Sequence, residues 1–396
     1  MTEWIECTLD KLGEIVGGAT PSTKCEDYYG GSIPWITPKD LSSFKGRYIT
    51  SGERNITEKG LASCSAQMMP KDAVLFTSRA PIGYVTIASQ SVCTNQGFKS
   101  IVVNEKADPL FVYYLLKYNK DAIEAMGSGT TFKEVSGKTM RAVKVRIPLD
   151  VSYQKRIAAV LDSLDTKIEN NERINDNLEQ QAQAIYHERF ETVSPNDLPS
   201  DWRIVTLGEV ATISNKSFNP LKEPEILLEH YSIPAFDEAR FPVFELSTSI
   251  KSNKFIIDTS CFMISKLNPT TKRVWKPYCL TGNAVCSTEF IVYKAKDKTI
   301  TDFLYSVIDS NSFSDFMCSH VTGSTGSRQR TTPSDTLSYE LILPSEDELT
   351  EFQSLVSPMY AQIRINAIEN DRLKRLRDSL LPKLMSGEID VSTIQL

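Results

Sequence analysis

The sequence predicts an α+β (mixed α/β) protein: two similar globular domains separated by two long helices that form an antiparallel coiled coil, with a pseudo-twofold internal repeat. Three observations lead to this prediction. Short motifs recur in the same order in both halves of the 396-residue chain. Each half begins with mixed strand and helix patterns, and each ends in an apolar repeat with a period of about 3.5 residues, which is typical of a coiled coil.

The internal repeat consists of several pairs of short motifs. Leu12-Gly13-Glu14-Ile15 recurs as Leu207-Gly208-Glu209-Val210. Because the pairs keep one order and a nearly constant separation, we infer two copies of one plan. The other pairs are Ser32-Ile33-Pro34 with Ser232-Ile233-Pro234, Cys93–Phe98 with Cys286–Phe290, Gly127–Thr130 with Gly323–Gly326, and Ile147-Pro148 with Leu343-Pro344.

Local patterns place strands and helices in the two globular domains. Runs rich in β-branched residues, bounded by Gly, Pro and Asn, predict strands at Ala73–Thr77, Tyr84–Ile87 and Ser100–Val103. Helical periodicity predicts helices at Pro109–Tyr118 and Thr301–Ile308.

A long helix is predicted at the end of each half. Seam residues alternate at spacings of four and three over 157–189 and again over 352–384. Two separate amphipathic helices are the alternative. Pro358 and Pro382 should kink the start of the second helix and disturb its end. The predicted segments are the first domain (1–150), the central helix (151–191), the second domain (192–345) and the C-terminal helix (346–396).

Two asparagines lie near the middle of each seam. In an antiparallel pair with full overlap, Asn171 faces the level of Asn370, and Asn175 faces the level of Asn366. Polar seam residues cost stability but fix register and orientation. We therefore expect these four side chains to set the register of the coil.

Composition and charge limit the class of protein. Apolar residues make up 41% and charged residues 24%, as in soluble globular proteins. No apolar run approaches the ~18 residues of a membrane span. Eight cysteines without a Cys-x-x-Cys pair predict the reduced thiols of a cytoplasmic protein and no metal site. The net charge is −6, so any nucleic-acid binding must depend on local patches or on a partner.

Motifs for catalysis are missing from the sequence. Gly137-Lys138-Thr139 imitates the end of a phosphate-binding loop, but Phe132 stands where the first glycine belongs. The glycine loop and catalytic motif of a methyltransferase are not found, nor is the carboxylate–lysine pattern of a Mg²⁺-dependent nuclease. The three histidines are dispersed. We therefore predict no catalytic residue.

A polar loop recurs in both halves. Gly323–Thr332 is rich in hydrogen-bond donors, and Gly127–Lys133 is its counterpart. Small residues let backbone N–H groups approach phosphates, while Arg and Gln can contact base edges bidentately. A solvated loop is the alternative, but recurrence in both halves favours a function for the loop. The candidate residues are Ser128, Thr130, Thr131, Lys133, Ser324, Thr325, Ser327, Arg328, Gln329 and Arg330.

Basic and aromatic residues alternate in a second cluster, Lys272–Tyr278. This composition suits phosphate contacts combined with stacking. A hairpin whose Trp275 and Tyr278 pack in the core is the alternative. The candidate residues here are Lys266, Lys272, Arg273 and Lys276.

The first half has less basic candidates. Arg79 lies in the stretch equivalent to the basic cluster, and Asn95 and Gln96 carry amides suited to reading adenine. A turn at Asn95-Gln96-Gly97 is equally compatible with the sequence. Two domains of one plan with different residues would read two different half-sites.

Four features together resemble a known family: the Leu-Gly-Glu-Ile/Val opening of each half, the run Ser32–Thr37, the Gly-Ser loop before an Ile/Leu-Pro strand end, and Gln154–Leu161 at the start of the first long helix. Over essentially its whole length, the chain resembles the specificity subunit of a type I restriction–modification system. Thr350-Glu351-Phe352-Gln353 departs from the Gln-Lys-Arg-Ile pattern at the second helix.

The resemblance implies two target-recognition domains that each read a few base pairs of a split, asymmetric site in double-stranded DNA, with the coil as a ruler. It also implies assembly with two methylation subunits, which use S-adenosylmethionine, and with restriction subunits that use ATP and Mg²⁺. The chain itself would be non-catalytic, without a cofactor and without a membrane partner. The alternative is a coiled-coil scaffold that binds protein partners without sequence-specific DNA recognition.

Overall fold

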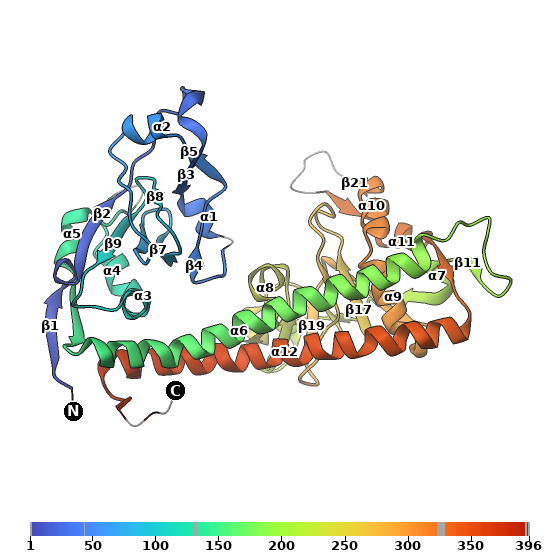
Figure 1. Cartoon of the computed structure of the whole chain (residues 1–396). Coiled ribbons are helices and arrows are strands. Elements are labelled where there is room, and N and C mark those ends of the chain that lie inside the picture. Colours follow the sequence, from blue (N-terminus) through green and yellow to red (C-terminus); the bar gives the residue numbers. More distant parts are fainter. Residues whose placement is uncertain (1, 43, 130–132, 323–328, 393, 395–396) are drawn as a thin grey trace. The chain divides into compact units, whose positions relative to one another are not determined.

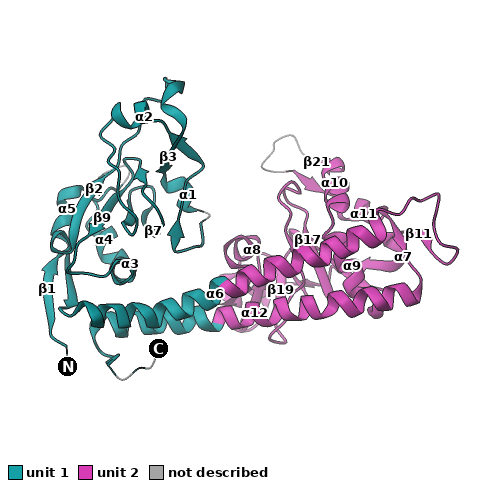
Figure 2. Cartoon of the chain, in the orientation of Figure 1, with its two compact units in different colours: residues 1–169, 372–396 teal, residues 170–371 magenta. Residues whose placement is uncertain are grey.

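The chain folds into two compact units. Unit 1 comprises residues 1–169 and 372–396, and unit 2 comprises residues 170–371 (Figure 2). Both unit boundaries fall inside long helices, so each unit contains one globular head and a stretch of both helices. The computed structural model describes all residues except 1, 43, 130–132, 323–328, 393, 395 and 396.

The long helices are α6 (Val151–Tyr186), which continues into the π-helical turn η3 (His187–Glu191), and α12 (Glu346–Ser386). Figure 1 shows α6 in green beside α12 in red. In unit 1, Arg377 of α12 contacts Asp165 of α6 at 2.7 Å; in unit 2, Arg189 contacts Glu348 at 2.9 Å. Higher numbers on one helix meet lower numbers on the other, so the pairing is antiparallel. The division of the chain into the four segments predicted from the sequence stays a prediction.

The two prolines of α12 do not interrupt it. The helix passes through Pro358 and Pro382 and ends at Ser386, so neither proline ends it, while the expected kink and end disturbance stay predictions. Each proline removes one backbone hydrogen bond. Apolar side chains such as Phe352, Val356 and Leu384, which are almost fully buried, hold the helix against its unit and offset that loss.

The first head is built on a five-stranded sheet of order β2-β9-β6-β7-β4, with a three-stranded sheet β5-β3-β8 and the pair β1-β10. Its strands are β1 Trp4–Thr8, β2 Gly13–Gly17, β3 Tyr29–Ile36, β4 Tyr48–Ile49, β5 Arg54–Ile56, β6 Val74–Ser78, β7 Ile82–Ala88, β8 Cys93–Thr94, β9 Lys99–Val103 and β10 Lys144–Pro148. Its helices are α1 Pro38–Ser42, α2 Glu58–Ala62, α3 Pro109–Tyr118, α4 Lys120–Ala125 and α5 Gly137–Ala142.

The second head contains the sheets β12-β20-β17-β18 and β13-β16-β19-β14-β15 and the pairs β11-β23 and β21-β22. Its strands are β11 Arg203–Thr206, β12 Ala211–Ile213, β13 Ser217–Phe218, β14 Leu227–Tyr231, β15 Val243–Leu246, β16 Lys254–Ile256, β17 Cys261–Ser265, β18 Val274–Trp275, β19 Ala284–Ser287, β20 Phe290–Ala295, β21 Val321–Thr322, β22 Arg330–Thr331 and β23 Glu340–Leu343. Its helices are α7 Leu207–Val210, α8 Ile233–Ala239, α9 Thr301–Ile308, α10 Asn311–Ser319 and α11 Pro333–Thr336.

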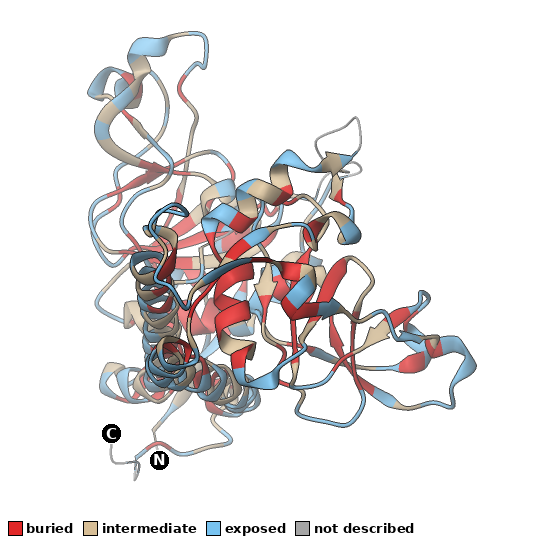
Figure 3. Cartoon of the chain, turned by 90° about the vertical axis from the view of Figure 1, so that its right-hand side faces the viewer, coloured by how far each residue is buried: buried red, intermediate tan, exposed pale blue. Residues whose placement is uncertain are grey.

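The central strand of each main sheet is buried on both faces. In β6, Val74 and Phe76 point into the core that α3 and α6 complete, whereas Leu75 lies in a second core. In β17, Phe262 and Met263 divide between two cores in the same way. This alternation follows from the two-residue period of a strand. Figure 3 shows buried residues concentrated on the strands and on the inward faces of the helices.

The two heads differ in the number of strands in each sheet but share a common set of strand pairings. The first strand of each head pairs antiparallel with its last, as β1 with β10 and β11 with β23. A parallel pair also occurs in each: Trp35 of β3 lies opposite Cys93, and Tyr231 of β14 lies opposite Cys286. The two-copy plan inferred from the motifs is therefore confirmed.

One motif pair behind that inference is wrong. Ser32-Ile33-Pro34 lies within β3, but Ser232 caps α8 by accepting a hydrogen bond from Ala235 N at 3.2 Å, and Ile233-Pro234 opens that helix. The same three residues form part of a strand in one head and the start of a helix in the other. A Ser at the capping position with a Pro in the first helical turn also suits a helix N-terminus.

The predicted strands and helices of the heads are confirmed. The three predicted strands correspond to β6, β7 and β9, and the two predicted helices have the bounds of α3 and α9. Helix α3 begins where it does because Asp108 accepts a hydrogen bond from Phe111 N at 3.0 Å and Pro109 stands at the first helical position. None of the described helices is long and apolar enough to cross a membrane.

Candidate nucleic-acid interface

The polar loop of the first head closes on itself at Glu134. Ser128 N donates to Glu134 O at 3.1 Å, and Glu134 N donates back to Ser128 O at 2.9 Å. Val135 N then donates to Ser78 O at 2.9 Å, at the end of β6. Ser128 and Lys133 are exposed, and Arg79 and Ser128 both form β-bridges with Glu134. The candidates Thr130 and Thr131 lie outside the described residues.

A turn at residues 95–97 lies next to this loop base. Ser78 N donates to Gly97 O at 2.7 Å, and Asn95 Oδ1 accepts from Gly97 N at 2.9 Å. Asn95 therefore stabilises a turn, which is the alternative that the sequence left open. Gln96 is exposed, and its side chain contacts the Thr20 hydroxyl.

Cations surround the loop base of the first head. Arg79 and Lys99 lie 3.5 Å and 3.7 Å from the two carboxylate oxygens of Glu134. An ideal Cβ on Gly137 would lie 3.5 Å from Arg141 Nη1 and 3.8 Å from Lys99 Cδ, so Arg141 joins the same group. Lys133, directly before Glu134, adds a further cation to this group, and such a cluster is the kind of local basic patch that phosphate binding needs.

Sequence reasoning missed Lys99 and Arg141. Lys99 directly follows the Cys93–Phe98 motif, which was the available signal, and Arg141 follows the loop on α5. Neither residue could be placed in the patch without knowing that β9, β6 and α5 meet there.

The second head closes its polar loop on the equivalent strand end. Thr331 N donates to Lys266 O at 3.1 Å, and Asn268 N donates to Gln329 O at 2.9 Å. Arg330 forms a bidentate pair with Glu289, at 2.9 Å and 3.2 Å. The structure thus brings Lys266, Gln329 and Arg330 together. The candidates Ser324, Thr325, Ser327 and Arg328 lie outside the described residues.

The two loop bases share a backbone frame but differ in charge. Val135 and Thr331 make the same hydrogen bond to the residue that ends β6 or directly follows β17. The preceding residue is Glu134 in the first head and Arg330 in the second. Glu134 is paired with cations, whereas the hydrogen bond with Glu289 raises the pKa of Arg330. One scaffold can therefore present different donors and acceptors in the two heads.

The second basic cluster is paired within the protein. Lys272 Nζ lies 3.1 Å from Asp309 Oδ1, and Arg273 contacts both carboxylate oxygens of Asp237, at 2.6 Å and 2.9 Å. Lys276 is paired with Asp302. Each cation therefore already has a carboxylate partner in the head, so its charge is balanced there.

The expected stacking role of this cluster is wrong. The Trp275 and Tyr278 side chains are almost completely buried, so the hairpin whose aromatic residues pack in the core is the correct alternative. Trp275 packs edge-on against Tyr231 with ring centroids 4.7 Å apart. Of the cluster candidates, Lys266 lies at the base of the polar loop, and the Arg273 carbonyl accepts a hydrogen bond of 2.9 Å from Ser265 N beside it, but the Arg273 side chain points to Asp237.

Comparison with known proteins identifies the family. A family model described as the type I restriction modification DNA specificity domain matches residues 1–180. The chain is 32% identical to the type I restriction enzyme MjaIX specificity subunit of Methanocaldococcus jannaschii, over 99% of this chain and 95% of that protein. The chain belongs to the type I restriction–modification specificity subunits.

Two further comparisons describe this specificity subunit. It is 29% identical to the type I restriction enzyme EcoR124I/EcoR124II specificity subunit of Escherichia coli, over 40% of each chain. Its fold matches the crystal structure of a type I restriction–modification S subunit from M. genitalium with a TM-score of 0.60 and 16% identity, over 97% of this chain and 96% of that one. Family membership supports DNA recognition over the scaffold alternative.

The seam asparagines of the specificity subunit contact one another in unit 2. Asn171 Nδ2 donates to Asn370 Oδ1 at 2.9 Å, and Asn366 Nδ2 donates to Asn175 Oδ1 at 2.8 Å. Asn171, Asn366 and Asn370 are 1%, 4% and 5% exposed. The partners are those that full antiparallel overlap places opposite each other, while a role in setting register stays a prediction.

Proposed function

We propose that each head of this specificity subunit reads one half of a bipartite, asymmetric DNA site, that the coil sets the spacing between the halves, and that the chain itself catalyses no reaction. The observation that supports this most strongly is the pair of equivalent loop bases. One backbone frame carries Glu134 in the first head and Arg330 in the second, so two heads with the same loop base offer different contacts.

Phosphate contacts would come from local patches. In the first head, Arg79, Lys99 and Lys133 form such a patch around the polar loop. Because the net charge of the chain is −6, these patches alone should support only weak binding. Partner subunits would supply the remaining affinity.

The proposed partners are double-stranded DNA, two methylation subunits and restriction subunits. S-adenosylmethionine, ATP and Mg²⁺ would be bound by those subunits, so this chain would need no cofactor of its own. A cytoplasmic location fits the eight free cysteines.

Methylome sequencing of the host tests the proposal. With the chain present, we expect methylation at one bipartite motif, and without it we expect that motif to lose methylation. Replacing residues 1–150 with the corresponding domain of another specificity subunit should change one half of the motif and leave the other half and the spacing unchanged. A swap that alters both halves, or a host methylome indifferent to the chain, contradicts the proposal.

A further inference from the structure

Three carboxylates lie on one face of α6 in unit 1, where the first head meets the helix. Asp162, Asp165 and Glu169 each follow a seam residue by one position, after Leu161, Leu164 and Ile168. Side chains at such spacings are neighbours on a helix, and like charges there repel. Asp165 is 6% exposed, so this face requires compensating cations.

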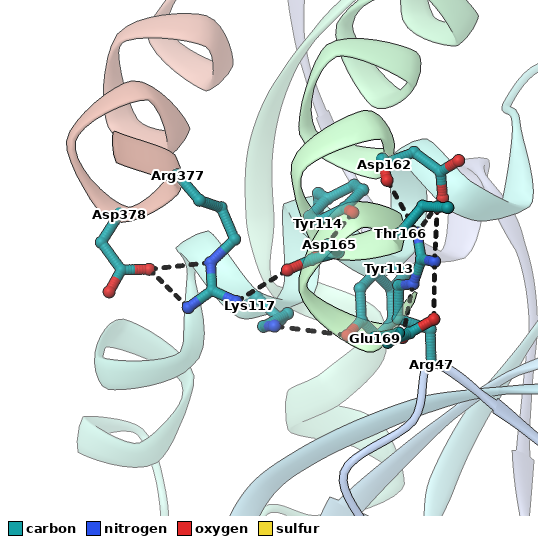
Figure 4. A network of polar contacts seen from close by, with 10 residues as sticks. All are labelled: Arg47, Tyr113, Tyr114, Lys117, Asp162, Asp165, Thr166, Glu169, Arg377 and Asp378. Atoms are coloured by element: carbon teal, nitrogen blue, oxygen red, sulfur yellow. Dashed lines mark hydrogen bonds and ion pairs between the residues drawn. The ribbon is translucent and has the colours of Figure 1, made fainter. Parts of the chain in front are cut away.

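Arg47 supplies the first compensation (Figure 4). Its Nε and Nη2 donate to the two carboxylate oxygens of Glu169 at 3.0 Å and 2.9 Å, and Nη2 also donates to Thr166 Oγ1 at 2.8 Å. Its Nη1 contacts Asp162. The Arg47 side chain is only 7% exposed. Burial lowers the pKa of this guanidinium, but the hydrogen bond with Glu169 and the two carboxylate charges outweigh burial and raise the pKa.

The backbone of Arg47 is bonded to the sheet of the head. Its carbonyl accepts hydrogen bonds from Ile87 N at 2.8 Å and from Thr86 Oγ1 at 2.8 Å, both on β7. One residue therefore joins β7 to α6, with the main chain bonded on one side and the guanidinium on the other. Rotation of the head about α6 would therefore break the bonds between the guanidinium and the helix.

A second tie runs through Asp165. Tyr114 of α3, which is fully buried, donates to Asp165 Oδ2 at 2.8 Å. Arg377 of α12 donates to Asp165 Oδ1 at 2.7 Å and is also paired with Asp378 at 2.8 Å. Figure 4 shows the carboxylate between the two partners. The head, α6 and α12 are therefore linked by a single carboxylate.

These polar ties have a property that the apolar contacts lack. The head also packs on α6 through Ile157 and Leu161, but apolar burial is non-directional and tolerates small rotations. A guanidinium that meets a carboxylate with two donors fixes both distance and angle. The polar ties therefore decide the orientation of the head on its helix.

The described ties of the second head to its helices involve fewer buried charges, although Gln183 Nε2 also donates to Ser306 O at 3.2 Å and Arg364 to Tyr278 O at 3.1 Å. At the position equivalent to Tyr114 and Asp165, Ser306 Oγ and Tyr360 OH share one neutral hydrogen bond of 2.8 Å. Its ion pair with α6, Arg240 with Glu179 at 2.7 Å, has an arginine side chain that is 51% exposed. In unit 1, more buried charged side chains therefore join the head to its helices.

Resting on the function proposed above, we propose that Arg47 is a positioning residue that fixes the angle of the first head on α6 and so restricts the spacing at which the two half-sites are accepted. Arg47 need not touch DNA for this role. Its contribution is to keep the head from turning when a site is one base pair too short or too long.

The test uses the full chain with the methylation subunits of its host. Plasmids carry the two half-sites at the spacing that the wild type methylates most, or at a spacing one base pair shorter or longer. For Arg47→Met, we expect the ratio of methylation at the native spacing to methylation at the altered spacings to fall by about tenfold, with the bases of each half-site unchanged. Arg47→Lys, which keeps the charge but not the bidentate geometry, should give an intermediate ratio.

The control is Lys39→Met, which removes an exposed ion pair with Glu53 from the same head and should leave the ratio unchanged. A role in stability alone would lower methylation at every spacing in proportion and so overturn the inference. If Arg47→Met does not fold, Glu169→Gln, which keeps a hydrogen-bond acceptor, tests the inference by the same ratio. If the wild type methylates all spacings equally, the proposed function itself is contradicted. If the wild type is selective but the Arg47→Lys and Glu169→Gln variants keep its ratio of methylation at the native spacing to methylation at the altered spacings, only this inference is contradicted.

Discussion

Asn171 donates a hydrogen bond of 2.9 Å to the side-chain oxygen of Asn370, across the antiparallel coil of unit 2. The same Nδ2 atom lies 2.7 Å from Glu369 Oε2. Both amides are almost fully buried. A buried amide costs free energy unless it is paired, so a slip of the helices would leave these groups opposite apolar residues.

We expect Asn171→Leu to destabilise the protein by about 1–3 kcal/mol, because the buried amide of Asn370 loses this hydrogen bond. The double variant Asn171→Leu/Asn370→Leu should recover most of that loss, since both polar groups are then replaced by apolar ones. Urea denaturation followed by circular dichroism measures the free energy of unfolding. A single variant as stable as the wild type would show that the pair does not matter for this register.

Arg47→Met should lower the free energy of unfolding by about 3–5 kcal/mol, because it leaves Asp162 and Glu169 without their buried cation. Lys39→Met is the matched control. Its ion pair with Glu53 has side chains that are 79% and 64% exposed, so the loss should be about 0–1 kcal/mol. Equal losses in the two variants, measured by the same denaturation, would contradict the importance of the buried contact.

Asp309 should make the second head less stable as the pH rises. Burial raises its pKa to about 6, although Lys272 opposes the shift, whereas the ordinary value is 3.8. The folded state therefore holds this proton more tightly than the unfolded state, and the stabilisation is full below pH 4 and is lost by about pH 6. We expect the stability of the wild type relative to Asp309→Asn to fall by roughly 2–3 kcal/mol over that range.

Asp297→Asn provides the control of opposite sign. Hydrogen bonds from Thr299 lower the pKa of Asp297, so its stabilisation is present above its ordinary pKa and is lost as the pH falls. Urea denaturation at a series of pH values compares each variant with the wild type. If both variants shift in the same direction with pH, the assignment of Asp309 is wrong.

Lys133→Met should weaken DNA binding by the assembled methylation complex to a similar degree for specific and non-specific DNA. A lost phosphate contact reduces the slope of log K against log salt concentration by about 1 and carries no base information. Binding titrations at several salt concentrations measure this slope. Lys39→Met, whose charge is already paired with Glu53, is the control, and a loss confined to the specific site would instead indicate a base contact.

Local patterns were sufficient for some of the regular elements of the heads. Helix α3 has the predicted bounds, Pro109–Tyr118, because its capping residue and its helical periodicity are both encoded within a few positions. Strand β6 could be recognised from an unbroken apolar run. Such signals depend on neighbours in the chain, so they survive without knowledge of the fold.

The side-chain partners could not be predicted in this way. Trp275 has a sequence environment that suits both stacking on a base and burial, and the decision came from Tyr231, which reaches it across the second head. Arg47 lies in a loop between α1 and β4, and the neighbouring sequence does not indicate that it forms buried ion pairs. The acids that it pairs with lie more than a hundred residues away on α6.

The sequence by itself determined the repeated plan, the two long helices and the asparagines of their seam, because periodicity and repetition are properties of the chain. The tertiary structure alone decided which cations gather at Glu134, which are neutralised within the second head, and how Arg47 holds β7 to α6. The physical reason is that charge and burial act through space. The environment of a side chain is set by the elements that fold around it, and those elements come from distant parts of the chain.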